Sequence, residues 1–160
     1  MSIFDTLVHF LSSQGARFRV LEHPAEGRSD LVARIRGTAP GQGAKAMLCK
    51  SRDGEGGLFL AVLPGDRKLD FKQLAQAVGV RRATLATPEE AMAGTGCAIG
   101  AIPPFSFQDG VRLVVDPALV RDFAEIAFNA GRLDRSIVLD SADYVRVARP
   151  LLHALSTDPH

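Results

Sequence analysis

The chain has 160 residues, 46% hydrophobic and 23% charged, which suits one ordinary globular domain with a core of its own. Its formal net charge of +1 excludes the heavy basic excess of a protein that coats duplex nucleic acid, but not contact with a short piece of nucleic acid. The N-terminus lacks the basic region of a signal peptide, and glycine or proline interrupts every long apolar run. We therefore expect a cytoplasmic protein without a membrane span.

The first half of the chain alternates between helical and strand-like patterns. Spacing and turn residues predict a helix from Ile3 to near Gly15, a strand at 18–22, a helix at 31–36, strands at 44–50 and 58–64, and a helix at 70–78. Ser29 and Asp30 are expected to cap the second of these helices, and Gly37 ends it. The Gly- and Asp-rich segment at 51–57 predicts a hairpin-type loop between the two central strands.

The second half continues the mixture. It predicts a short strand near 83–86, a helix opened by Thr87 and Pro88, strands at 111–115, 125–131 and 136–140, a helical start at 116–117, and a closing helix at 141–155 kinked before Pro150. These elements indicate a single α+β domain over 1–160, with a flexible tail at 156–160. We expect one mixed, mostly antiparallel sheet of six or seven strands, barrel-like, with helices around it.

Residues 91–108 form the most unusual segment, because they carry no charged side chain and contain the sequence GAIPPFSF. Pro103 and Pro104 lack backbone donors, so the segment is a poor central strand, yet it is more apolar than most surface loops. Its proline-fixed backbone and its glycines predict either a buried connector or a rigid pocket wall that presents backbone amides.

Residues 31–52 carry five basic side chains and no acid, which indicates a solvated basic edge or a site for an anion. Lys45 stands out because it opens an apolar strand after the flexible GQG sequence. The GQGAK segment lacks the spacing of a nucleotide-binding phosphate loop, and no serine lies in a nucleophile elbow. Cys49, Cys97 and the four histidines lack metal-ligand spacing, so we expect buried free thiols, no metal and no cofactor.

Three segments occur together in the order and at the spacing of one known family: RGTAPGQGAKAMLCK at 36–50, TGCAIGAIPPFSF at 95–107 and EIAFNAGRLDRSIVL at 125–139. From about Phe10 to Pro150 the chain resembles the YbaK-like aminoacyl-tRNA deacylases, related to the editing domain of bacterial prolyl-tRNA synthetases. The family's lysine falls on Lys45, and its GxxxP loop falls on the segment from Gly100 to Pro104.

The resemblance implies a free-standing, trans-acting hydrolase that removes small amino acids such as serine, threonine or alanine from mischarged tRNA. It implies Lys45 as the catalytic residue and the acceptor end of tRNA as partner, with an aminoacyl-tRNA synthetase as a further partner. The expected substrate-binding residues are His23, Gly100, Ala101, Ile102, Pro103, Pro104, Ser106, Asn129 and Gly131. The expected tRNA-binding residues are Arg34, Arg36 and Lys50.

Two departures from the family pattern bear on specificity. Pro103 replaces a small polar residue that many relatives have, and Ser106 replaces a glycine. This branch is associated with serine and threonine rather than with cysteine or alanine, and His23, Ser106 and Asn129 are the candidates to recognise a substrate hydroxyl. A non-catalytic module that binds tRNA or a synthetase, or a structural or small-ligand protein, are the alternative functions.

Overall fold

The computed structural model of the chain describes residues 2–54 and 56–157. Its helices are α1 (Ile3–Ser13), α2 (Ser29–Arg36), α3 (Phe71–Val78), α4 (Pro88–Thr95), α5 (Pro117–Asp122) and α6 (Ser141–Ala148), with a short 3-10 helix at Pro40–Gln42. Its strands are β1 (Phe18–Glu22), β2 (Ala44–Ser51), β3 (Leu58–Pro64), β4 (Ala83–Leu85), β5 (Val111–Val115), β6 (Glu125–Arg132), β7 (Arg135–Asp140) and β8 (Leu151–Leu152). No helix in these two stretches is long and apolar enough to cross a lipid bilayer.

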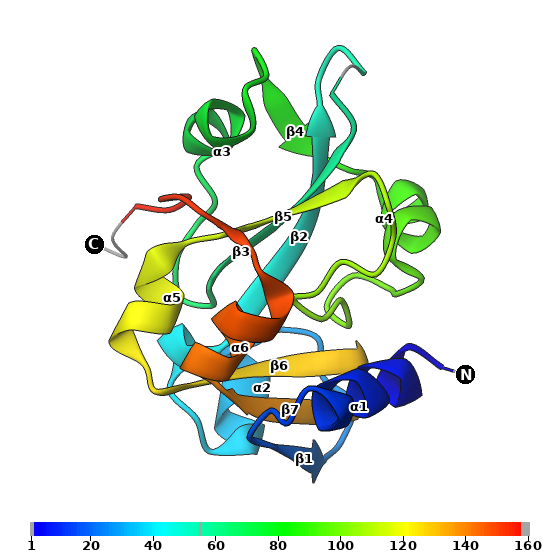
Figure 1. Cartoon of the computed structure of the whole chain (residues 1–160), viewed down its shortest axis with the longest axis vertical. Helices are drawn as coiled ribbons and strands as arrows, with labels where there is room; N and C mark the ends of the chain where they lie inside the picture. Colours follow the sequence, from blue (N-terminus) through cyan, green and yellow to red (C-terminus); the bar gives the residue numbers. More distant parts are fainter. Residues whose placement is uncertain (1, 55, 158–160) are drawn as a thin grey trace.

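The strands form two sheets that meet in the middle of the molecule (Figure 1). The larger sheet has the order β4-β2-β3-β5-β8, in which β2 runs antiparallel to both neighbours and β5 runs parallel to β3 and β8. The smaller sheet, β1-β7-β6, is entirely antiparallel. A bridge between Gly43 and Ala127 joins the two. The α+β class is confirmed, with the strands divided between two adjoining sheets instead of lying in one.

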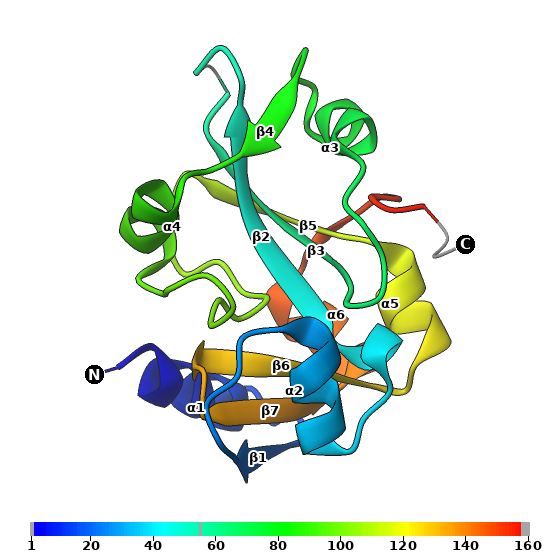
Figure 2. The ribbon, with the colours of Figure 1, turned by 180° about the vertical axis from the view of Figure 1, so that it is seen from behind.

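Helices cover both faces of the smaller sheet. Figures 1 and 2 show α1 and α6 on one face and α2 on the other. The end of α2 is bonded to β6 and β7 through Arg36, and the start of β2 lies beside β6 at the Gly43 bridge. Side chains from α2, β2 and β6 therefore converge where the two sheets meet.

Local signals account for most helix boundaries. The Asp70 carboxylate accepts hydrogen bonds from two amides at the start of α3, and Thr87 forms a capping box with Glu90 at the start of α4. The cap expected for α2 is different: the helix already begins at Ser29, with Arg28 at the N-cap position and no capping side chain. Since Ser29 does not cap the helix, its hydroxyl is free for another role.

The C-terminal region departs most from the predicted elements. Helix α6 ends at Ala148 because Arg149 adopts a left-handed conformation (φ 49°), so the predicted kinked helix at 141–155 is wrong. The chain continues as β8, which pairs with β5. Ser156 bridges to Leu69 and donates a hydrogen bond to buried Asp116, so the ordered chain reaches at least this residue. Of the tail predicted at 156–160, residues 158–160 lie outside the described residues.

The proline-containing loop is fixed from behind by an aromatic cluster. Fully buried Tyr144 on α6 donates a hydrogen bond of 2.6 Å from its hydroxyl to the carbonyl of Pro104. The Phe105 ring packs edge-to-face against Tyr144, Phe10 and Phe128. This packing explains why the loop is so apolar, because the side of the loop that faces Tyr144 belongs to the core. The same contacts hold the opposite side of the loop in a fixed position.

Candidate active site

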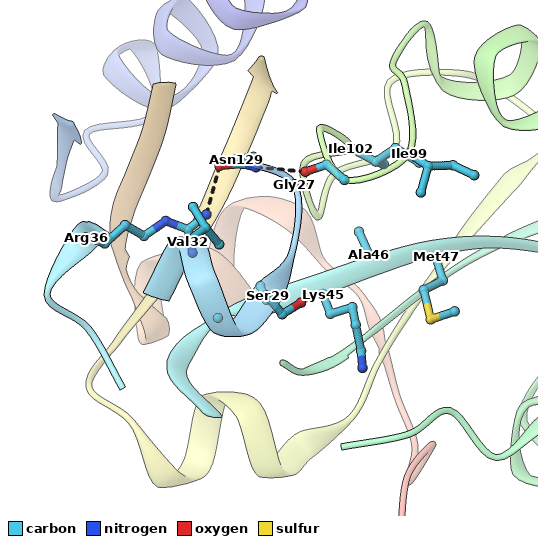
Figure 3. Close-up of a pocket in the computed structure, with 13 residues that line it drawn as sticks. Gly27, Ser29, Val32, Arg36, Lys45, Ala46, Met47, Ile99, Ile102 and Asn129 are labelled. Carbon is cyan, nitrogen blue, oxygen red and sulfur yellow. Dashed lines mark hydrogen bonds between the residues drawn. The ribbon is translucent and has the colours of Figure 1, made fainter. Parts of the chain in front are cut away.

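A cavity of about 190 Å³ lies where the two sheets meet, between α2, the start of β2, β6 and the proline-containing loop (Figure 3). It is lined by Gly27, Ser29, Val32, Arg36, Gly43, Ala44, Lys45, Ala46, Met47, Ile99, Gly100, Ile102 and Asn129. This lining contains two cationic side chains and no carboxylate. The cavity therefore suits a group that carries or develops negative charge.

Lys45 enters the lining from β2, opposite Leu63 of β3. Its Nζ donates a hydrogen bond to the backbone carbonyl of Arg67. Partial burial lowers the pKa of the Lys45 ammonium from its usual range, and the nearby Asp66 carboxylate opposes that shift. The ammonium group is thus held at the cavity by one neutral acceptor, and its remaining N–H groups are available to a ligand.

Arg36 supplies the second cation and is largely buried at the end of α2. Its Nε donates to Ser136 Oγ at 2.7 Å, and its Nη2 donates to Asn129 Oδ1 at 3.0 Å. Burial lowers the pKa of the guanidinium to about 10, so it stays charged at neutral pH. No carboxylate pairs with it within the described residues, so it is a fixed, uncompensated positive charge in the pocket wall.

Asn129 connects the two loops that face each other across the cavity. Its Nδ2 donates to the carbonyls of Glu26 at 2.9 Å and Gly100 at 2.8 Å, while its Oδ1 accepts from Arg36 and Ser136 (Figure 3 draws the bonds with Arg36 and Gly100). Both ends of the amide are therefore fully used. Because Asn129 holds both backbones, it sets the width of the cavity.

His23 lies one layer behind this network. Its Nε2 is 2.7 Å from Ser136 Oγ, and its Nδ1 is 2.8 Å from the carbonyl of Pro24. A carbonyl can only accept, so Nδ1 donates the hydrogen bond to Pro24. The Ser136 hydroxyl has a single proton, which it donates to Asn129 in the network above. The structure thus places His23 in contact with the wall of the cavity rather than in its lining.

The loop presents two backbone amides without a partner. The Ala101 amide donates to the Ala98 carbonyl, and the Ala101 carbonyl accepts from the Gly131 amide, so both of these groups are occupied. The amides of Gly100 and Ile102, by contrast, make no hydrogen bond to any part of the chain that the structure describes. Both residues line the cavity, and neither amide is used within the described chain.

Other predicted site residues lie outside the lining. Pro103 and Ser106 border a neighbouring smaller cavity, where the Ser106 hydroxyl donates to the Val111 carbonyl. Pro104 and Gly131 support the loop from behind through the bonds described above. Five of the predicted residues do line the cavity. They are the expected catalytic residue Lys45, the expected substrate-binding residues Gly100, Ile102 and Asn129, and Arg36, which was expected to bind tRNA.

The three residues expected to bind tRNA have different surroundings. The Arg34 side chain is exposed on α2 and makes no hydrogen bond or ion pair with the rest of the described chain. Lys50 is bonded to both carboxylate oxygens of Glu90, at 2.7 and 2.9 Å. Arg36 points into the buried network. Of the three, Arg34 is the side chain that is free at the surface.

Several lining residues were not predicted from the sequence. Ser29 and Val32 come from α2, and Gly27 precedes it. Ser136, buried behind Arg36, completes the polar network from β7. The available signal was the predicted helix within the acid-free basic window, which is compatible with a helix that faces an anion.

Cys49 and Cys97 are confirmed as buried free thiols. Burial raises the pKa of Cys49 to about 12, and it raises that of Cys97 as well, so neither is a reactive thiolate. Among the described residues no group of three His, Cys, Asp or Glu side chains is placed to hold a metal ion.

We predict that Gly100→Ala lowers the free energy of unfolding more than Gly79→Ala does. Both glycines have left-handed backbones (φ 89° and 76°), which cost an alanine about 1–2 kcal/mol. A Cβ at Gly100 would lie 3.0 Å from the Cα of Gly27 and 3.1 Å from its carbonyl oxygen, whereas one at Gly79 meets open space. Denaturant unfolding measures the difference. If both variants lose the same free energy of unfolding, the loops that contain Gly27 and Gly100 can move apart without cost.

Comparison with known proteins agrees with this architecture. Residues 23–147 match the family model of the aminoacyl-tRNA editing domain. The chain is 52% identical over 147 residues to the multifunctional Ser/Thr-tRNA deacylase ProXp-y of Escherichia coli, covering 91% of this chain and 88% of that protein. It is 34% identical over 103 residues to a proline–tRNA ligase of Pelobacter propionicus, covering 64% of this chain and 17% of the ligase.

A solved structure described as a candidate trans-editing enzyme for prolyl tRNA synthetase has the same fold. Its TM-score is 0.83 at 22% sequence identity, and the match covers 99% of both chains. A second solved structure, of a hypothetical protein, has a TM-score of 0.85 at 20% identity over 94% of this chain and 99% of the other. With the family model spanning most of its length, the chain belongs to the aminoacyl-tRNA editing domain family.

Proposed function

We propose that the protein is a trans-editing hydrolase that cleaves the ester between a small amino acid, serine or threonine above all, and the terminal adenosine of mischarged tRNA. The observation that carries this proposal is the cavity itself. It has two cations, two unpartnered backbone amides and no acid in its lining, in a chain that is 52% identical to a Ser/Thr-tRNA deacylase. These donors are what an ester carbonyl needs as it becomes an oxyanion.

The chemistry requires no covalent nucleophile. An aminoacyl ester is already activated, so holding it beside a water molecule or the substrate's own ribose hydroxyl accounts for a large part of the acceleration. We assign the Gly100 and Ile102 amides to the ester carbonyl, since they line the cavity and lack other partners. We assign the Lys45 ammonium to the terminal adenosine or its phosphate, through a charge-assisted contact. Arg36 keeps the wall positive and fixes Asn129.

Selectivity follows from the size of the cavity. Asn129 ties the two facing loops together, and Gly27 and Gly100 bring their backbones into contact, so a larger side chain cannot widen the space without breaking these bonds. A volume of about 190 Å³ admits a small amino acid and part of the ribose, but not a bulky side chain. Such a second, smaller site removes small amino acids that a synthetase cannot reject by binding alone.

The partner is the acceptor end of tRNA, which must approach along the open side of α2. Exposed Arg34 on this helix is suited to a backbone phosphate. A second, mostly basic group lies at the far end of β2, where Arg52, Arg81 and Arg82 line one surface depression together with Asp53. From Lys45 to Ser51 the strand rises about 20 Å, so one acceptor stem could contact both places. A partner synthetase and a cytoplasmic location are part of the same proposal.

A panel of tRNAs carrying serine, threonine, alanine or cysteine tests the proposal directly. We expect the purified protein to release serine and threonine faster than alanine, and cysteine slowest. The measurement is the loss of labelled amino acid from tRNA under single-turnover conditions. If none of the four esters is hydrolysed above the uncatalysed rate while the protein still binds tRNA, the protein is a binding module instead of an enzyme.

A further inference from the structure

The hydroxyl of Ser29 is the one polar side-chain group of the cavity lining with no hydrogen bond in the described part of the chain. The polar side chains of the lining are Ser29, Arg36, Lys45 and Asn129. Arg36 is bonded to Ser136, Lys45 to the Arg67 carbonyl, and Asn129 to the backbones of the two facing loops. Ser29 therefore offers the cavity both a donor and an acceptor that no described residue uses.

The local structure explains why this hydroxyl is free. A serine at the start of a helix ordinarily caps it, but here the Glu26 carboxylate accepts from the amides of Gly27 and Arg28 at 3.0 and 3.1 Å and turns the chain into α2. Arg28 takes the N-cap position, and Ser29 becomes the first helical residue. The turn is thus made without the Ser29 side chain.

Backbone packing then fixes the position of the Ser29 Cβ beside the cavity. A Cβ added at Gly65 would lie 3.4 Å from the Cβ of Ser29. The first turn of α2 therefore packs closely against the loop that follows β3. Figure 3 shows Ser29 and Lys45 among the residues that surround the cavity, one from α2 and one from β2. One turn further along α2, buried Val32 provides an apolar surface beside the hydroxyl.

We propose that Ser29 is a specificity-determining residue that recognises the side-chain hydroxyl of a serine or threonine attached to tRNA. This inference rests on the proposed function and assigns its selectivity to one side chain. A β-hydroxyl and Ser29 can each donate to the other, which gives one neutral hydrogen bond in a small cavity. The apolar surfaces of Val32 and Ala46 accommodate the extra methyl group of threonine. Alanine fits the same space but leaves the Ser29 hydroxyl unpaired.

The test compares Ser29→Ala with the wild-type protein on tRNAs charged with serine, threonine and alanine. We expect kcat/KM for serine and threonine to fall about five- to tenfold, the value of one neutral hydrogen bond, and kcat/KM for alanine to stay within about twofold. Ser13→Ala is the matched control, since its hydroxyl bonds to the Phe10 carbonyl at the end of α1, away from the cavity. Ser29→Thr, which keeps the hydroxyl, should retain a preference for serine over alanine.

Three outcomes would overturn the inference or its basis. An unchanged ratio of serine to alanine hydrolysis in Ser29→Ala would show that the hydroxyl does not select. An equal fall for all three esters, in a variant that unfolds at the wild-type denaturant concentration, would assign Ser29 to general positioning. If the wild-type protein hydrolyses none of the esters, the proposed function fails first, and this inference fails with it.

Discussion

Replacing Lys45 with alanine should reduce deacylation more than any other single change at the surface of the cavity. We expect kcat/KM for serine release to fall about 10²-fold or more, because without this charged contact the terminal adenosine no longer holds the ester in its reacting position. Lys45→Met keeps the length of the side chain but removes its charge. We expect it to lower kcat/KM nearly as much as Lys45→Ala, because the substrate contacts the charged group and not the alkyl chain. Single-turnover deacylation of Ser-tRNA gives the rate.

Stability separates this effect from unfolding. The ammonium of Lys45 makes one hydrogen bond, to the Arg67 carbonyl, so its loss should lower the free energy of unfolding by only about 1 kcal/mol. Arg19→Ala removes a surface cation from β1, far from the lining residues, and serves as the charge-matched control. If Lys45→Ala keeps more than a third of the wild-type rate, the assigned contact with substrate is wrong.

Much of the fold could be predicted because the signals lie next to the elements that they delimit. Asp70, Thr87 and Pro88 each stand at the start of a helix, and Gly37 directly follows one. The alternation of short strands with these helices was enough to predict the α+β class. What the pattern did not contain was the division into two sheets, which depends on contacts such as the Gly43–Ala127 bridge between distant segments.

The misplaced C-terminal helix has the same cause. The sequence at 141–155 is compatible with a helix throughout, apart from Pro150. In the structure Arg149 turns into the left-handed region, and Leu151 and Leu152 pair with Val114 and Val115. Pairing with a strand more than 30 residues away outweighs the local preference, and a single sequence does not show that competition.

The candidate site shows a similar limit. Lys45, Gly100 and Asn129 were identified by motif and order, and the fold brings them to one cavity. Arg36 was expected on a tRNA-facing surface, as part of an acid-free basic window. Its burial depends on Ser136, 100 residues away, which carries no signal of its own in the sequence. Residues whose role comes from a distant partner are those that a single sequence does not reveal.

Replacing Arg36 with methionine should separate activity from stability. The guanidinium is buried without a carboxylate, so methionine removes a desolvation penalty along with two hydrogen bonds, and the two effects oppose each other. Ser136 and Asn129 also bond directly to each other at 3.1 Å, and we expect this bond to persist in the variant. We therefore expect the free energy of unfolding to change by less than about 1 kcal/mol.

Activity should respond far more than stability does. Without Arg36 the Asn129 amide loses its charged donor, so the Gly100 carbonyl that it holds is less firmly placed, and the wall loses one of its two cations. We expect kcat for Ser-tRNA to fall about 10²-fold with a smaller change in KM, because small misplacement of reacting groups acts mainly on the chemical step. Arg36→Lys should recover little, since one ammonium cannot reach both Ser136 and Asn129.

Asn129→Ala provides the contrast that decides between positioning and simple structural support. It breaks the bonds to the Glu26 and Gly100 carbonyls and leaves the Arg36 guanidinium with Ser136 alone, so it should lower the free energy of unfolding by about 2–4 kcal/mol as well as the rate. A structural role for Arg36 would make its variant resemble this one in both measurements. If Arg36 is a positioning residue, Arg36→Met should have the unfolding curve of the wild-type protein and a slow chemical step. The guanidinium then supplies charge to the cavity and orients Asn129, but it is not required for folding.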